Sequence, residues 1–177
     1  TASGVSAGLK SSDKLDLAVI VAPEEALCTG TFTQSIVRAK CVDLCLQRLS
    51  KQAGKIRAVL INSGQANACT GKRGLDDSLL ATKALSKRLG IAEEEVLICS
   101  TGVIGVPIPM DNLLKGIKPL VNGLSSEGGA NAAQAILTTD LIDKQIAIEA
   151  FLGGRRVRIG GIAKGSGMIH PNMATML

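Results

Sequence analysis

The residues best suited to chemistry lie in the last sixteen positions, 162–177. This segment contains Lys164 and a small Ala174 followed by Thr175, a bond of the kind that self-cleaving precursors cut. Cleavage there would make Thr175 an N-terminal residue. Its own α-amine, with an intrinsic pKa of about 8, would then serve as the base for its hydroxyl. We therefore predict a nucleophile at Thr175 and a cleavage site at Ala174–Thr175. The alternative is a Gly-rich loop that leads into a truncated helix or strand.

The same segment suggests a serine–histidine pair, which the spacing does not support. Ser166 and His170 are four residues apart in a loop of Gly and Pro, and such a loop does not define their geometry. We expect His170 to be structural. The final MATML sequence at 173–177 is apolar enough to require a packing partner. It leads us to expect a fragment or one half of a pair.

Two loops that follow apolar runs are further candidates for a site. The first, NSGQANACTG at 62–71, could cradle a phosphate, but it lacks both GxxxxGK[ST] and GxGxxG, so tight-turn packing or a substrate site is the other interpretation. The second, STGVIG at 100–105, contains Thr101 and Gly102. Because Gly102 lets backbone N–H groups face a ligand, this turn can form an oxyanion hole. The alternative is a simple connection to the next helix.

The composition favours one globular unit that handles small molecules. A chain of 177 residues with 46% hydrophobic residues can bury a good core. With two Phe and no Trp or Tyr, it is unlike nucleic-acid readers that stack bases on aromatic rings. The net charge of +5 suits anionic substrates such as amino-acid carboxylates. The basic residues at 155–158 are typical of a solvated hairpin end.

The cysteines and histidine argue against metal and disulfide frameworks. Five cysteines without CxxC spacing indicate reduced core thiols, and one histidine leaves a metal site short of ligands. No apolar run approaches membrane-spanning length. We expect a cytoplasmic protein. Because the sequence begins at Thr1 without Met, a targeting segment could have been removed, and an organelle remains open.

The elements that must position these residues alternate between strands and helices, which predicts an α/β fold. After a flexible segment at 1–10, the pattern predicts strands at 15–22, 28–33, 56–61 and 96–99, with the first two paired as a hairpin. It also predicts helices at 35–52, 74–89 and 128–137. A further helix should begin with Asp111 as its N-cap and bend or end at Pro119. Alternating residues at 144–151 and 155–163, separated by Gly153 and Gly154, predict a second hairpin.

The segments 62–71, 100–105, 138–140 (TTD) and 164–177 together resemble the ornithine acetyltransferase family, also called glutamate N-acetyltransferase, the bifunctional enzyme of the cyclic arginine pathway. The resemblance implies a layered α/β/β/α fold of the N-terminal-nucleophile type, completed by a second chain. Residues 1–177 would be the α chain of a self-cleaved precursor. Its partner would be the β chain of the same precursor, in an α2β2 heterotetramer.

The resemblance also implies roles for individual residues, carried over by position. These are the nucleophile Thr175, an oxyanion hole of Thr101 and Gly102, and substrate contacts from Thr138, with Thr139 a near alternative, from Lys164 and from Thr175. The implied reaction moves an acetyl group from N-acetylornithine to glutamate without a cofactor, and some members also use acetyl-CoA as a donor. One departure is that a processed α chain would end at Ala174, whereas this sequence continues to Leu177.

Two other functions remain open from the sequence. A related N-terminal-nucleophile aminopeptidase or amidase would pass the acyl group to water. A non-catalytic ligand-binding domain would use the loop at 62–71 and would never become acetylated.

Overall fold

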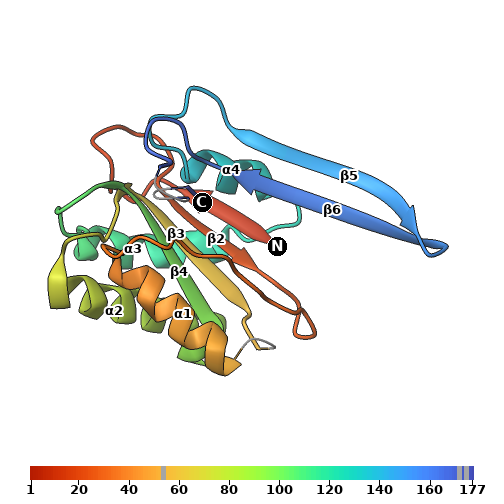
Figure 1. Cartoon of the computed structure of the whole chain (residues 1–177), viewed down its shortest axis with the longest axis horizontal. Coiled ribbons are helices and arrows are strands. Elements are labelled where there is room, and N and C mark those ends of the chain that lie inside the picture. Colours follow the sequence, from red (N-terminus) through yellow and green to blue (C-terminus); the bar gives the residue numbers. More distant parts are fainter. Residues whose placement is uncertain (53–54, 171–172, 174–175) are drawn as a thin grey trace.

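The computed structural model describes residues 1–52, 55–170, 173 and 176–177. Its strands form a four-stranded sheet in the order β1-β2-β3-β4 and a separate two-stranded hairpin (Figure 1). In the sheet, β2 is antiparallel to both β1 and β3, and β3 is parallel to β4. The strands are β1 (Ala2–Val5), β2 (Leu17–Val21), β3 (Ala58–Gln65), β4 (Val96–Val103), β5 (Lys144–Leu152) and β6 (Arg155–Ala163).

Helices cover both faces of this sheet unequally. One face packs against α1 (Lys40–Gln52), α2 (Gly71–Leu89) and α3 (Met110–Asn122), and the other against the short helix α4 (Gly129–Ala135) (Figure 1). A single 3-10 turn, Glu93–Glu95, precedes β4. The α/β class predicted from the alternating pattern is therefore confirmed.

Side-chain alternation along β2 explains the two cores. Leu17 and Val19 point into the larger core with α1, α2 and α3, whereas Ala18 points into the smaller core with Ala132 and Ala135 of α4. All five side chains are fully buried. The sheet thus has no solvated face at β2, which explains why this strand reads as an unbroken apolar run.

Two of the predicted elements near the N-terminus are wrong. The segment 28–33 is not a strand, because β1 and β3 already occupy both edges of β2. The segment 1–10, predicted to be flexible, instead supplies β1. Small residues are needed there because β1 runs close under α4, where a side chain at Gly4 would lie 2.3 Å from the carbonyl oxygen of Asn131.

The predicted helices are confirmed with shifted ends. Helix α1 begins at Lys40 rather than at 35, and Val37, predicted to face the core, is 68% exposed. Asp111 is not the N-cap of α3, because that helix begins at Met110 and Asp111 lies in its first turn. Pro119 does not end the helix, which continues to Asn122.

The hairpin β5–β6 is confirmed, and it has one mostly apolar face and one mixed face that also carries Phe151 and Ile162. Gly153 and Gly154 form its turn with φ of 57° and 76°. The pairing places the apolar residues Ile146, Ile148, Ala150, Leu152, Val157 and Ile159 on one face. Glu149 lies on the other face, where it forms ion pairs with Arg156 and Arg158. We call the first face the apolar hairpin face.

None of the described helices is long and apolar enough to cross a membrane. That residues 1–177 form one structural unit stays a prediction.

Candidate active site

Strands β3 and β4 bring two of the predicted site segments side by side. They run parallel with Ser63 opposite Thr101 and Gly64 opposite Gly102. Both glycines have positive φ, 126° and 134°, and a side chain at Gly102 would lie 2.2 Å from the backbone carbon of Gly64. The backbones can approach this closely only because Gly102 lacks a side chain. Thr101 and Gly102, predicted to lie in a turn, are therefore part of β4 and are held against β3.

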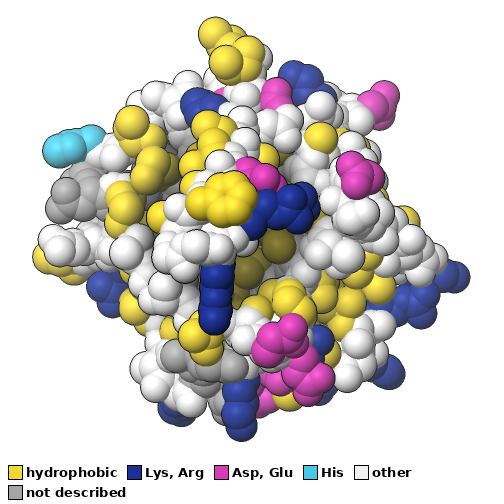
Figure 2. Space-filling view, turned by 90° about the vertical axis from the view of Figure 1, so that its right-hand side faces the viewer, with side chains coloured by type: hydrophobic (Ala, Val, Ile, Leu, Met, Phe, Trp, Pro, Cys, Tyr) yellow, Lys and Arg dark blue, Asp and Glu magenta, His cyan; other side chains and the backbone are white. Residues whose placement is uncertain are grey.

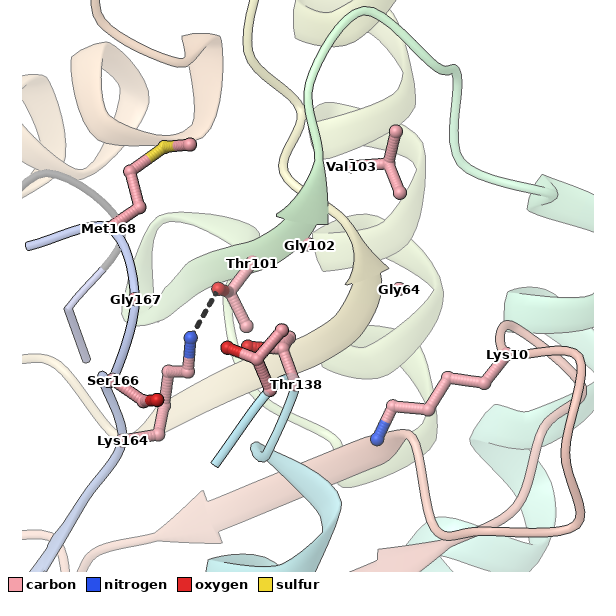
Figure 3. A pocket seen from close by; sticks show the side chains of 11 residues that line it. Lys10, Gly64, Thr101, Gly102, Val103, Thr138, Lys164, Ser166, Gly167 and Met168 are labelled. Carbon is pink, nitrogen blue, oxygen red and sulfur yellow. Dashed lines mark hydrogen bonds between the residues drawn. The ribbon is translucent and has the colours of Figure 1, made fainter. Parts of the chain in front are cut away.

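A cavity of about 380 Å³ opens at this strand end (Figure 3). It is lined by Lys10, Gly64, Thr101, Gly102, Val103, Thr138, Thr139, Lys164, Ser166, Gly167 and Met168. Each described residue that the sequence analysis assigned to the site is therefore in its wall. Ala174 and Thr175, the predicted cleavage site and nucleophile, lie outside the described residues.

Lys164 and Thr101 make the central contact of the cavity. The Lys164 Nζ donates a hydrogen bond of 3.1 Å to the Thr101 Oγ1, although 63 residues separate them (Figure 3). Both residues are buried, with 4% and 1% of their surface exposed. Burial lowers the pKa of Lys164, the carboxylate of Asp140 raises it in part, and the ammonium of Lys144 lowers it further.

Asp140 is a charged neighbour to which the sequence analysis gave no role. One of its oxygens, Oδ2, lies 4.0 Å from the Lys164 Nζ, and the other, Oδ1, accepts hydrogen bonds from the Lys144 Nζ and, at 2.9 Å, from the Gly165 N–H. Burial raises the pKa of Asp140, but hydrogen bonds from Lys144, Gly165 and Thr138 outweigh it and hold the pKa at about 2. Asp140 is therefore an anion at neutral pH.

Lys10 is a second cation in the wall, on a loop that the sequence predicted to be flexible. The carboxylate of Asp16, which is fully buried, accepts N–H groups from Ala7 and Leu9 at 2.6 Å and from Lys10 at 3.1 Å. The Lys10 Nζ donates to the carbonyl of Leu15 at 2.8 Å. Burial lowers the pKa of Lys10, Asp16 raises it, and Lys14 and Lys164 lower it. With Lys164, this residue gives the cavity a cationic character that suits a carboxylate ligand.

The segment 62–71, predicted to be a loop, is strand β3 as far as Gln65, and several of its polar side chains bind protein atoms. The Asn62 side chain donates to Gln65 O and accepts from Ser100 Oγ, and the Ser63 hydroxyl donates to Ala135 O. Asn67 Oδ1 accepts the Cys41 N–H at the start of α1. These bonds favour the tight-turn interpretation over a phosphate cradle.

Ser166 and His170 face different spaces. Ser166 lines the cavity described above, whereas His170 lines a second, largely apolar cavity of about 630 Å³ with Met168, Met176 and Leu177. This placement gives no support to a Ser166–His170 pair. The second cavity is lined by the segment before α1 and the start of that helix, by β3 and β4, and by the last described residues.

Fold and cavity together define an α/β protein with a small, cationic site at the ends of two parallel strands. The model of the ArgJ family matches residues 1–177, and the chain belongs to this family. The resemblance drawn from the four sequence segments is therefore confirmed.

Relatives with this family's name are close in sequence. The chain is 73% identical over 176 residues to "Arginine biosynthesis bifunctional protein ArgJ" of Prochlorococcus marinus, and 56% identical over 176 residues to the protein of the same name from Synechocystis sp.. Each match covers 99% of this chain but only 43% and 42% of the relative. The chain thus spans less than half the length of these relatives.

Two solved structures have the same fold. One is the arginine biosynthesis bifunctional protein ArgJ of Bacillus halodurans, with 40% identity, a TM-score of 0.90, and coverage of 98% of this chain and 90% of that chain. The other is ornithine acetyltransferase of Mycobacterium tuberculosis complexed with ornithine, with 40% identity, a TM-score of 0.89, and coverage of 98% and 91%. The predicted N-terminal-nucleophile type of α/β fold is confirmed by this match.

Proposed function

We propose that the complete protein transfers an acetyl group from N-acetylornithine to glutamate in arginine biosynthesis, and that this chain forms much of the active site. The observation that carries the proposal is the cavity, in which Lys164 is bonded to Thr101 beside Gly102, Thr138 and Thr139. Membership of the ArgJ family supports the choice of substrates, and so does the ornithine in complex with the Mycobacterium tuberculosis relative.

The reaction proceeds through an acetylated threonine. The Thr175 hydroxyl attacks the amide carbonyl of N-acetylornithine while the α-amine of Thr175 takes its proton. The tetrahedral intermediate collapses when the C–N bond breaks, and ornithine leaves with that proton. The amine of glutamate then attacks the acetyl ester, which releases N-acetylglutamate and restores the threonine.

The wall of the cavity stabilises the intermediate. Because the Thr101 oxygen accepts a hydrogen bond from Lys164, its own hydrogen is left to donate to the oxyanion. A second donor is the backbone at Gly102, where no side chain separates it from the ligand. A well-placed oxyanion donor lowers the activation free energy by roughly 3–4 kcal/mol. Lys164, Thr138 and Thr139 contact the substrate, and the ammonium groups of Lys164 and Lys10 attract its carboxylate.

This exchange requires no cofactor, since one substrate supplies the acetyl group and the other supplies the amine. Acetyl-CoA would enter as a co-substrate that acetylates the same threonine. We place the reaction in the cytoplasm, with its arginine-pathway substrates.

The partner of this chain is a second chain of the same precursor, made by cleavage between Ala174 and Thr175 and assembled as α2β2. Its existence is supported by the length of the relatives, since this chain covers only 43% of the Prochlorococcus marinus protein. It is also supported by the apolar hairpin face, on which Ile146 is 68% exposed and Leu152 is 59% exposed. Figure 2 shows hydrophobic side chains around a hollow on the side of the molecule toward which the hairpin extends.

The test is the substitution Thr175→Ala in the full-length precursor. We expect one uncut band on a denaturing gel and no N-acetylglutamate formed from N-acetylornithine and glutamate. The matched control is Thr175→Ser, which keeps a hydroxyl nucleophile and should be cut and acetylated. Efficient cutting and normal acetyl exchange by the alanine variant would remove Thr175 from the mechanism.

The wild-type assay separates this proposal from a hydrolase. An aminopeptidase or amidase would release acetate at the same rate with or without glutamate. Acetyl transfer instead requires a product that depends on glutamate, and an acetylated chain in the intact mass spectrum.

A further inference from the structure

Asp140 and Lys164 form a buried ion pair beside the cavity. Their side chains are 0% and 3% exposed, and 4.0 Å separates the Asp140 Oδ2 from the Lys164 Nζ. An ammonium taken out of water requires a nearby negative charge to stay protonated. Asp140 supplies that charge, and its own pKa of about 2 keeps it ionised throughout the working pH range.

The same carboxylate ties together segments that are distant in sequence. Its Oδ1 accepts the N–H of Gly165, the residue after Lys164, and the ammonium of Lys144 at the start of β5. Asp140 itself directly follows Thr138 and Thr139, which line the cavity. One carboxylate therefore fixes the end of β6 and the threonine loop relative to each other.

The contact continues from Lys164 to the reacting groups. The Lys164 Nζ donates to the Thr101 Oγ1 at 3.1 Å, and this bond decides where the Thr101 hydrogen can point. The Lys164 ammonium polarises the Thr101 hydroxyl to which it donates, and so strengthens that hydroxyl as a donor. Asp140 contributes by keeping the ammonium charged. Asp140 does not line the cavity, so its charge acts on the reacting groups through Lys164.

We infer that Asp140 is a positioning residue for acetyl transfer, which holds the Lys164 ammonium against Thr101 and so aims the Thr101 hydroxyl at the reacting carbonyl. This inference rests on the function proposed above. It adds to that function a residue that lies outside the cavity. The charge of this residue should determine at which alkaline pH the activity is lost.

The charged groups around Lys164 predict the direction of that dependence. Asp140 raises the pKa of Lys164, and Lys144 lowers it, while Lys10 faces the same cavity as a further cation. If the charged ammonium is needed, activity falls as the pH rises through the pKa of Lys164. Removing the Asp140 charge lowers this pKa, so the alkaline loss of activity moves to lower pH. Removing the Lys144 charge moves it to higher pH.

The experiment compares Asp140→Asn with the control Lys144→Met in the full-length precursor, after a denaturing gel has shown how much of each is cut. The kcat/KM for acetyl transfer from N-acetylornithine to glutamate is measured against pH. We expect Asp140→Asn to lose about tenfold or more at neutral pH, since a misaligned reacting group can cost a factor of about 100. Its alkaline limb should move to lower pH, and that of Lys144→Met to higher pH.

Several outcomes would overturn the inference. An Asp140→Asn profile that overlays the wild type would do so, and so would a uniform loss at every pH, which indicates a merely structural role. If the asparagine variant does not fold, Asp140→Glu keeps the charge and must retain the wild-type alkaline limb; a shift there contradicts the inference. A wild-type protein without acetyl transfer would instead refute the proposed function.

Discussion

Asp16 shows how one buried carboxylate determines part of the cavity wall. Its two oxygens accept the N–H groups of Ala7, Leu9 and Lys10, and so fold the loop that carries the Lys10 ammonium to the cavity. The N–H of Asp16 itself bonds to the carbonyl of Val5 at the end of β1. After β1 ends at Val5, hydrogen bonds to the Asp16 carboxylate therefore hold this loop in place of strand pairing.

Replacing Asp16 by Ala should destabilise the protein on the order of 3 kcal/mol, because it removes the acceptor of three backbone N–H groups, one of them buried and two partly buried. The free energy of unfolding from urea titration of the full-length protein measures this. Asp13→Ala is the matched control, since Asp13 is exposed in the same loop. Equal stability of both variants would contradict a supporting role for Asp16.

Sequence reasoning found the residues that line the cavity but not those that hold them. Thr101, Gly102, Thr138, Thr139 and Lys164 were predicted from motifs, and each is in the wall. Asp140 belongs to the TTD motif but was given no role, because its partner Lys164 lies 24 positions away and only the fold brings them together. A charged residue directly after two candidate threonines was the available signal. For Lys10, the sequence contained no signal of a place in the cavity wall beyond its charge.

At the scale of elements, the approach of β3 to β4 is what forms the site. A side chain at Gly102 would meet the backbone of Gly64 at 2.2 Å, and one at Gly64 would meet the carbonyl oxygen of Leu9 at 2.7 Å. Backbone atoms cannot move aside as a flexible side chain can. The two strands and the loop before β2 therefore fit together only with glycine at these positions.

Gly102→Ala should cost about 3 kcal/mol or more, because it adds overpacking to the strain of a positive φ. We also expect it to abolish acetyl transfer by separating the Thr101 end of β4 from β3. Gly105→Ala is the control, since Gly105 has φ of 81° but nothing within 4 Å of an added side chain. It should cost only about 1–2 kcal/mol. Thermal unfolding of both variants is the measurement, and equal losses would show that the close approach is unimportant.

The elements that sequence patterns missed were those defined by long-range contacts. The hairpin β5–β6 was predicted within one residue, because its two-glycine turn and its alternation are local signals. By contrast, the pairing of β1 with β2 depends on small residues that fit under α4, and β2 is already paired on both edges, so the run at 28–33 cannot form the predicted hairpin with it. Helix α1 starts where Asn67 accepts the Cys41 N–H, a contact across 26 residues.

At the scale of the whole molecule, the hairpin β5–β6 is incomplete without a covering surface. A two-stranded hairpin is marginal in water on its own, and this one extends away from the sheet (Figure 1). On the apolar hairpin face, Ile148 is 49% exposed and its cross-strand partner Ile159 is 51% exposed. The opposite face is held by the ion pairs of Glu149 with Arg156 and Arg158. The apolar hairpin face therefore lacks the ion-pairing charges of the opposite face and is the face suited to burial against a second chain.

The two faces allow a direct test of the proposed second chain. Ile148→Asp places a charge on the apolar hairpin face, and burying it unpaired would cost several kcal/mol, so about 3 kcal/mol would weaken association of the chains roughly 100-fold. Ala147→Asp, one residue earlier on the opposite face, which carries the ion pairs of Glu149, adds the same charge and should leave assembly unchanged. Size-exclusion chromatography with mass detection of the cleaved protein measures both. Intact assembly of the Ile148 variant would mean that the second chain lies elsewhere and that the apolar hairpin face has another partner.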